Sequence, residues 1–109
     1  MSDDDASLDN IPGPKVPADA LSRELPIINK SGLHARASAK FVQMVERFNA
    51  EVWVTKGGET VGGTSIMGLM MLSAGPGSMI VVSATGPEAQ AALDAISALV
   101  AGKFNEEAS

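Results

Sequence analysis

The chain contains a single histidine, His34, and the residues around it favour a chemical role for this side chain. A turn-forming run at 29–32 precedes His34, and apolar residues with helical spacing follow from Ala35. We therefore expect His34 at or just before a helix N-terminus, where unpaired backbone N–H groups and the helix dipole attract an anion. The same field disfavours the imidazolium form and leaves a neutral, nucleophilic ring. A neutral imidazole beside a phosphate-sized anion site predicts a phosphohistidine.

Arg36 follows His34 by two positions and can add a guanidinium to whatever anion binds there. A cation is unfavourable at a helix N-terminus, so an arginine in this place indicates an anion. The backbone N–H groups of Ala35, Arg36 and Ala37 would be the donors to that anion, and the small side chains of the two alanines leave room for a partner.

The apolar segment 66–72 is expected to form a helix of two turns, with Ser65 as its N-cap. Not all of its large apolar residues can be buried in so short a helix; we expect Ile66, Leu69 and Leu72 to face the core. Met67 and Met70 would then be exposed and could form an adaptable partner surface, while plain core packing remains the alternative for either methionine.

Length and composition predict one small globular domain of 109 residues, with 45% hydrophobic and 19% charged residues. There is no cysteine, no apolar run long enough to span a membrane, and no basic-then-apolar leader pattern. No paired acids, metal-ligand cluster or glycine-rich nucleotide loop is evident. We therefore expect a cytoplasmic protein that uses no metal or cofactor.

The net charge of −5 is concentrated at the N-terminus, where residues 1–20 carry five aspartates and one lysine. The rest of the chain is almost neutral, and between Asn29 and Val45 it holds Lys30, Arg36 and Lys40 without an acid. A nearly neutral domain argues against bulk nucleic-acid binding. The local positive region suits docking on an acidic protein surface, with an ordinary solvated face as the alternative.

The periodicity predicts strands over 21–28, 51–56, 59–63 and 78–84, and helices over 35–48, 66–72 and 87–101. Pro26 places the first strand at a sheet edge, and Trp53 is expected to be a packing residue. Ser31, Ser38 and Ser73 are interpreted as turn or cap residues. This β-α-β-β-α-β-α order indicates an α+β domain over 21–104 whose helices stack on one face of a sheet, with the other face open. Residues 1–20 are expected to be a disordered tail, either solubilising or a tether, and 105–109 a short C-terminal tail.

Two motifs carry a family resemblance. The run Gly32-Leu33-His34-Ala35-Arg36, continued by Ala37-Ser38-Ala39, resembles the active-site signature of HPr, the histidine-containing phosphocarrier of the bacterial phosphoenolpyruvate-dependent phosphotransferase system. The run Ser65-Ile66-Met67-Gly68-Leu69-Met70 is similar to the regulatory serine segment of the same family, and the separation of the two motifs fits. The resemblance covers Leu21 to about Phe104. Many family members have proline where this chain has Ala37.

The resemblance implies an open-faced β-sandwich, with a four-stranded antiparallel sheet and three helices on one face. It implies that Enzyme I phosphorylates His34 at Nδ1, that Arg36 stabilises the transferred group, and that an Enzyme IIA-type protein accepts it. Ser65 is the position that an ATP-dependent kinase modifies in some lineages. Met67, Met70 and Lys40 are our candidates for partner docking.

The sequence therefore predicts a monomeric carrier for sugar uptake, without independent turnover and without nucleic-acid or membrane partners. Two alternatives stay open within the same fold: a nitrogen-type regulatory branch of the same chemistry, and a non-phosphorylated adaptor. An enzyme with His34 as general base is disfavoured, since no orienting acid lies near it in the sequence.

Overall fold

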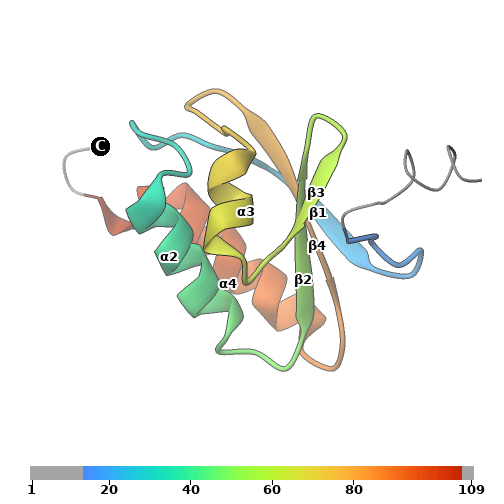
Figure 1. Ribbon diagram of the computed structural model, residues 1–109. Helices are drawn as coiled ribbons and strands as arrows, with labels where there is room; N and C mark the ends of the chain where they lie inside the picture. Colours follow the sequence, from blue (N-terminus) through green and yellow to red (C-terminus); the bar gives the residue numbers. More distant parts are fainter. Residues whose placement is uncertain (1–13, 107–109) are drawn as a thin grey trace, which may run out of the picture.

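The computed structural model describes residues 14–106, which form a four-stranded sheet covered on one face by helices (Figure 1). The strands are β1 (Leu21–Pro26), β2 (Glu51–Lys56), β3 (Glu59–Gly62) and β4 (Met79–Thr85). The helical elements are α2 (Ala35–Val45), α3 (Ile66–Met71), α4 (Ala89–Ala101) and a short turn, η1 (Lys103–Asn105). The predicted α+β class and element order are confirmed.

The strands are antiparallel throughout and lie in the order β1-β4-β2-β3. β1 is an edge strand, as Pro26 predicts, because a proline has no N–H to donate to a second neighbour. β4 lies inside the sheet, and its Ile80, Val82 and Ala84 are fully buried against the helices. Gly57 and Gly58 join β2 to β3 with φ of +58° and +85°, a hairpin turn that glycine adopts without steric cost.

α2 ends at Val45, three residues earlier than predicted, because its last turn tightens. The N–H of Arg47 donates to Met44 and that of Phe48 to Val45, which are i to i−3 bonds. Of the apolar residues with helical spacing from Ala35, Val42 and Val45 are buried as that spacing predicts, whereas Ala35 itself is exposed. The other buried residues of the helix are Ala37, Ser38 and Phe41. Ser38 is thus a buried helical residue rather than a turn or cap residue.

Two other expectations fail locally. Ile66 is 41% exposed, so the buried residues at α3 are Leu69 and the cap residue Leu72. α4 begins at Ala89 rather than at Pro87, because Glu88 is held outside the helix by Asn49: the Glu88 N–H donates to the Asn49 carbonyl at 3.1 Å, and its Oε1 accepts from the Asn49 N–H at 2.6 Å.

The face of the sheet opposite the helices is open, as predicted, but Trp53 at its centre is covered. Val52 and Val54 belong to the core, so Trp53 between them points to the opposite face, yet it is only 8% exposed. A turn in which the Ala20 N–H donates to the Pro17 carbonyl reverses the chain ahead of β1, and Pro14 lines a hollow together with Trp53 and Gly62. The N-terminal segment therefore contributes to this face. The expectation of a disordered tail concerns mainly residues 1–13, which lie outside the described residues.

Across residues 14–106, none of the helices has the length and apolar character needed to cross a membrane.

Candidate functional site

The turn before His34 is fixed by a close approach of two backbones. Gly32 has φ of +63°, and a Cβ at this position would lie 2.2 Å from the carbonyl oxygen of Ala74. The N–H of Leu33 donates to that same oxygen at 2.9 Å. Two features therefore exclude a side chain at residue 32: the left-handed backbone angle, and the clash that a Cβ would make with the Ala74 carbonyl. This pairing also places the loop that follows α3 directly beside the start of α2.

His34 is the N-cap of α2, as predicted. Its backbone is extended, with φ of −76° and ψ of −176°, and its carbonyl accepts the first helical bond from Ser38 at 2.8 Å. The ring nitrogen Nδ1 accepts from the N–H of Arg36 at 3.2 Å. The imidazole is one third exposed, so it can be approached from solvent while one nitrogen lies at the positive end of the helix.

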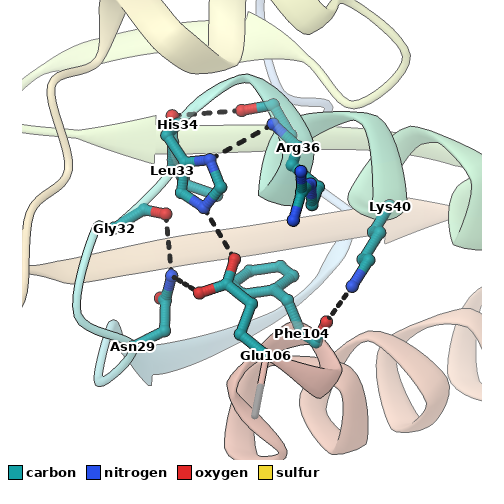
Figure 2. A network of polar contacts seen from close by, with 9 residues as sticks. Asn29, Gly32, Leu33, His34, Arg36, Lys40, Phe104 and Glu106 are labelled. Atoms are coloured by element: carbon teal, nitrogen blue, oxygen red, sulfur yellow. Dashed lines mark hydrogen bonds and ion pairs between the residues drawn. The ribbon is translucent and has the colours of Figure 1, made fainter. Parts of the chain in front are cut away.

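The other ring nitrogen is held by a carboxylate from the far end of the chain. Nε2 of His34 lies 2.6 Å from Oε2 of Glu106, whose side chain is 13% exposed (Figure 2). The fully buried Asn29 steadies this carboxylate, since its Nδ2 donates to Oε1 of Glu106 at 3.2 Å and to the Gly32 carbonyl at 2.9 Å. An ionised carboxylate only accepts hydrogen bonds, and so Nε2 is the protonated nitrogen of the neutral ring. Nδ1, which accepts from an amide, then carries the lone pair.

Glu106 reaches His34 because the chain turns back after α4. Lys103, Phe104 and Asn105 have φ of +58°, +56° and +61°, a left-handed turn built without glycine. Phe104 is fully buried in the core and anchors the turn. The Lys40 ammonium donates to the Phe104 carbonyl at 2.6 Å. Lys40, expected as a docking residue, thus ties the C-terminal turn to α2 in this structure.

Arg36 lies on the exposed side of the first turn of α2. Within the described part of the chain, no hydrogen bond or ion pair holds its guanidinium, while its backbone N–H is used by the ring of His34. Ala35 is exposed and Ala37 is fully buried, so Ala37 can offer an incoming group only its backbone. The predicted cradle residues are therefore all in the first turn of α2, with Arg36 as a cation available to an anion.

Ser65 is the N-cap of α3, as predicted, and its Oγ accepts from the Gly68 N–H at 2.9 Å. Met67 and Met70 are 69% and 40% exposed, which agrees with their expected position on the surface. Together with Ile66 and Met71 they form what we call the α3 apolar surface. α3 packs against α2, so this surface belongs to the same side of the molecule as the helix that His34 begins.

Reasoning from the sequence missed Glu106 and Asn29. The acid that orients the ring lies 72 residues away from it, so no local spacing reveals it. The available signal was Phe104, a large aromatic residue just after the Gly102 cap of α4, which indicates that the chain turns back to the core there. Residues 14–106 contain no group of three or more histidine, cysteine or carboxylate side chains that could hold a metal ion.

Comparison with known proteins identifies the family. The family model described as "PTS HPr component phosphorylation site" matches residues 21–102. The phosphocarrier protein HPr of Cupriavidus necator is 49% identical over 86 residues, which is 79% of this chain and 97% of that protein. The phosphocarrier protein NPr of Shewanella violacea is 44% identical over 86 residues, covering 79% and 94% of the two chains. The crystal structure of an HPr from Thermoanaerobacter tengcongensis superposes with a TM-score of 0.76 at 39% identity, covering 80% of this chain and 98% of that one.

The chain therefore belongs to the HPr family of phosphocarrier proteins. It is a component of the phosphotransferase system that carries a phosphoryl group, not an enzyme with independent turnover. This chain covers 97% of the HPr of Cupriavidus necator, and about a fifth of its own length lies outside the aligned part.

Proposed function

We propose that His34 accepts a phosphoryl group on Nδ1 from Enzyme I and passes it to an Enzyme IIA-type protein in the cytoplasm. The observation that carries this proposal is the state of the two ring nitrogens. Nε2 is occupied by Glu106 at 2.6 Å, while Nδ1 keeps its lone pair at the N-terminus of α2. A phosphoryl group bonded to Nδ1 would meet the backbone N–H groups of the first helical turn.

Phosphoryl transfer to His34 requires few further groups from the carrier. The Nδ1 lone pair attacks phosphorus, a phosphorus–nitrogen bond forms, and the bond from phosphorus to the donor breaks with its electron pair returning to the donor. Before the reaction, the backbone N–H of Arg36 donates a hydrogen bond to Nδ1. When Nδ1 bonds to phosphorus, this N–H loses its acceptor and becomes available to a phosphoryl oxygen. Phosphoryl transfer depends mainly on positioning and electrostatics, and a helix N-terminus supplies both.

Arg36 is proposed to stabilise the transferred group. Its guanidinium is exposed, without a bond to the described residues, and starts two positions from the ring. Because the cation otherwise raises the energy of the helix N-terminus, an anion bound there would relieve an unfavourable interaction as well as form a new one.

The α3 apolar surface is proposed as the place where both partners dock. Met67 and Met71 are 69% and 70% exposed, which is costly in water and useful in an interface. Flexible methionine side chains fit differently shaped surfaces, as a carrier with two successive partners requires.

A second candidate function is the nitrogen-type regulatory branch, and one observation favours it. A phosphocarrier protein NPr is 44% identical to this chain, close to the 49% of the HPr of Cupriavidus necator. Both branches would use the same His34 chemistry, and they would differ in the acceptor. A test offers the phosphorylated protein to a sugar-type and a nitrogen-type Enzyme IIA and compares the transfer rates.

Ser65 is proposed as a second, regulatory phosphorylation site. Its hydroxyl is at a helix start, where a phosphate is also favourable, and it borders the α3 apolar surface. A dianion there would repel an acidic partner. Incubation with ATP and a cognate kinase, with Ser65→Ala as the control, tests this site separately.

The central experiment incubates the protein with Enzyme I and labelled phosphoenolpyruvate. We expect phosphate that is stable in alkali and labile in acid, and none in His34→Ala. If the wild-type protein takes no label, or His34→Ala takes as much, the proposal fails and a non-phosphorylated adaptor becomes the better interpretation.

A further inference from the structure

Glu106 contacts the nitrogen of His34 that does not react. Its Oε2 lies 2.6 Å from Nε2, its side chain is 13% exposed, and its second oxygen accepts from the buried Asn29 at 3.2 Å. A surface ion pair between two mobile side chains would have neither the burial nor the second support. This carboxylate is instead held at a fixed place and angle, at the end of an anchored turn (Figure 2).

We infer that Glu106 is a positioning residue for phosphoryl transfer, which acts through the ring of His34. The inference rests on the proposed function of His34. Glu106 does two things: it holds the neutral ring in the Nε2–H form, and it stabilises the positive charge that the ring gains when Nδ1 attacks.

The positive charge on the His34 ring follows from counting the atoms and electrons in the phosphoryl transfer. The neutral ring enters with its proton on Nε2 and a lone pair on Nδ1. When Nδ1 bonds to phosphorus, the electron pair of the broken bond leaves with the donor, no proton moves, and the ring becomes an N-phosphoryl imidazolium. The carboxylate of Glu106, 2.6 Å from Nε2, then faces a cation instead of a neutral N–H. A hydrogen bond with charge on both partners is stronger than one with charge on a single partner, so the carboxylate stabilises the product side of the step.

The architecture supports a positioning role over a purely structural one. The turn is closed without the Glu106 side chain: the Glu106 backbone N–H donates to the Lys103 carbonyl at 3.0 Å, Phe104 is buried, and Lys40 holds the Phe104 carbonyl at 2.6 Å. These contacts hold the turn without the carboxylate of Glu106, whose two oxygens contact Asn29 and the ring of His34.

The test uses Glu106→Gln, which keeps the size of the side chain and removes its charge, with Glu51→Gln as a matched control. Glu51 is an exposed glutamate at the start of β2. With Enzyme I and phosphoenolpyruvate, we expect Glu106→Gln to slow the labelling of His34 by about tenfold. Glu51→Gln should label at the wild-type rate, and urea denaturation should show a cooperative unfolding transition for both variants, so that a slower rate is not due to loss of the fold.

A second readout does not depend on transfer at all. His34 is the single histidine, so ¹⁵N-histidine labelling gives one pair of ring signals. At a pH where the ring is neutral, we expect a slowly exchanging Nε2 proton in the wild-type protein, and fast exchange with a shift toward mixed tautomers in Glu106→Ala. The inference is overturned if Glu106→Gln labels as fast as Glu51→Gln, or if the Nε2 proton exchanges equally fast in wild-type protein and Glu106→Ala. If the wild-type protein takes no label, the proposed function fails, whatever the ring signals show.

Discussion

Replacing Phe104 by alanine should release the C-terminal turn and, with it, the carboxylate that holds the ring of His34. Phe104 is fully buried, and it sits in the middle of three consecutive residues with left-handed backbone angles. Lys103 and Phe104 each cost about 1–2 kcal/mol in this conformation, or about 2–4 kcal/mol together, whereas asparagine adopts it more readily. The turn therefore exists only because another interaction offsets this cost.

The free energy gained by burying the Phe104 ring is large enough to offset the backbone cost of the turn. An aromatic side chain buries about 150–250 Å², which at about 25 cal/mol per Å² stabilises by about 4–6 kcal/mol. Truncation of a buried phenylalanine to alanine typically costs about 3–5 kcal/mol. Without the ring, the polar contacts of Lys40 and Glu106 are too weak to offset the backbone cost, and Glu106 should leave Nε2.

Two measurements check this prediction. Urea denaturation, followed through the single tryptophan Trp53, should show a loss of about 3–5 kcal/mol in the free energy of unfolding. The Nε2 proton of His34 should exchange fast in Phe104→Ala. Phe48→Ala is the matched control, because Phe48 packs at the edge of the core, away from the turn, and should lose stability while keeping a protected Nε2 proton. A destabilised Phe104→Ala that still protects this proton would refute the reasoning.

Three further outcomes are expected. Gly32→Ala should lower the free energy of unfolding much more than Gly57→Ala, because both glycines have φ near +60° but only the first would clash, with the Ala74 carbonyl; equal losses in urea denaturation would contradict this. Ser65→Ala should cost about 1 kcal/mol through the lost N-cap, without slowing histidine phosphorylation, which denaturation and labelling together measure. Lys40→Met should speed exchange of the Nε2 proton by loosening the C-terminal turn; unchanged exchange would show that Lys40 does not hold it.

Much of this site could be predicted from the sequence because its parts are local. The turn at Gly32, the helix that starts after His34 and the cap at Ser65 are each specified within a few residues. The edge position of β1 also follows from a local signal, since Pro26 can be placed only at an edge. These local patterns predict a histidine nitrogen at a helix N-terminus that can accept a phosphoryl group.

The orientation of that acceptor could not be predicted, because it depends on tertiary contacts. Glu106 meets the ring through a left-handed turn that Lys103 and Phe104, which disfavour such angles, do not signal. The exposure of Ala35 at the start of α2 has a related cause: which side of a helix is buried depends on where the sheet lies. Ile66 was expected inside because it is apolar, yet a helix of six residues leaves one side uncovered.

The most direct test of the account identifies the nitrogen that carries the phosphoryl group. The protein is labelled with ¹⁵N-histidine, phosphorylated by Enzyme I and phosphoenolpyruvate, and examined for coupling between ³¹P and the ring nitrogens of His34. We expect coupling to Nδ1 alone, with a proton retained on Nε2 beside Glu106. Coupling to Nε2 would contradict it, because that nitrogen is the one the structure assigns to the carboxylate.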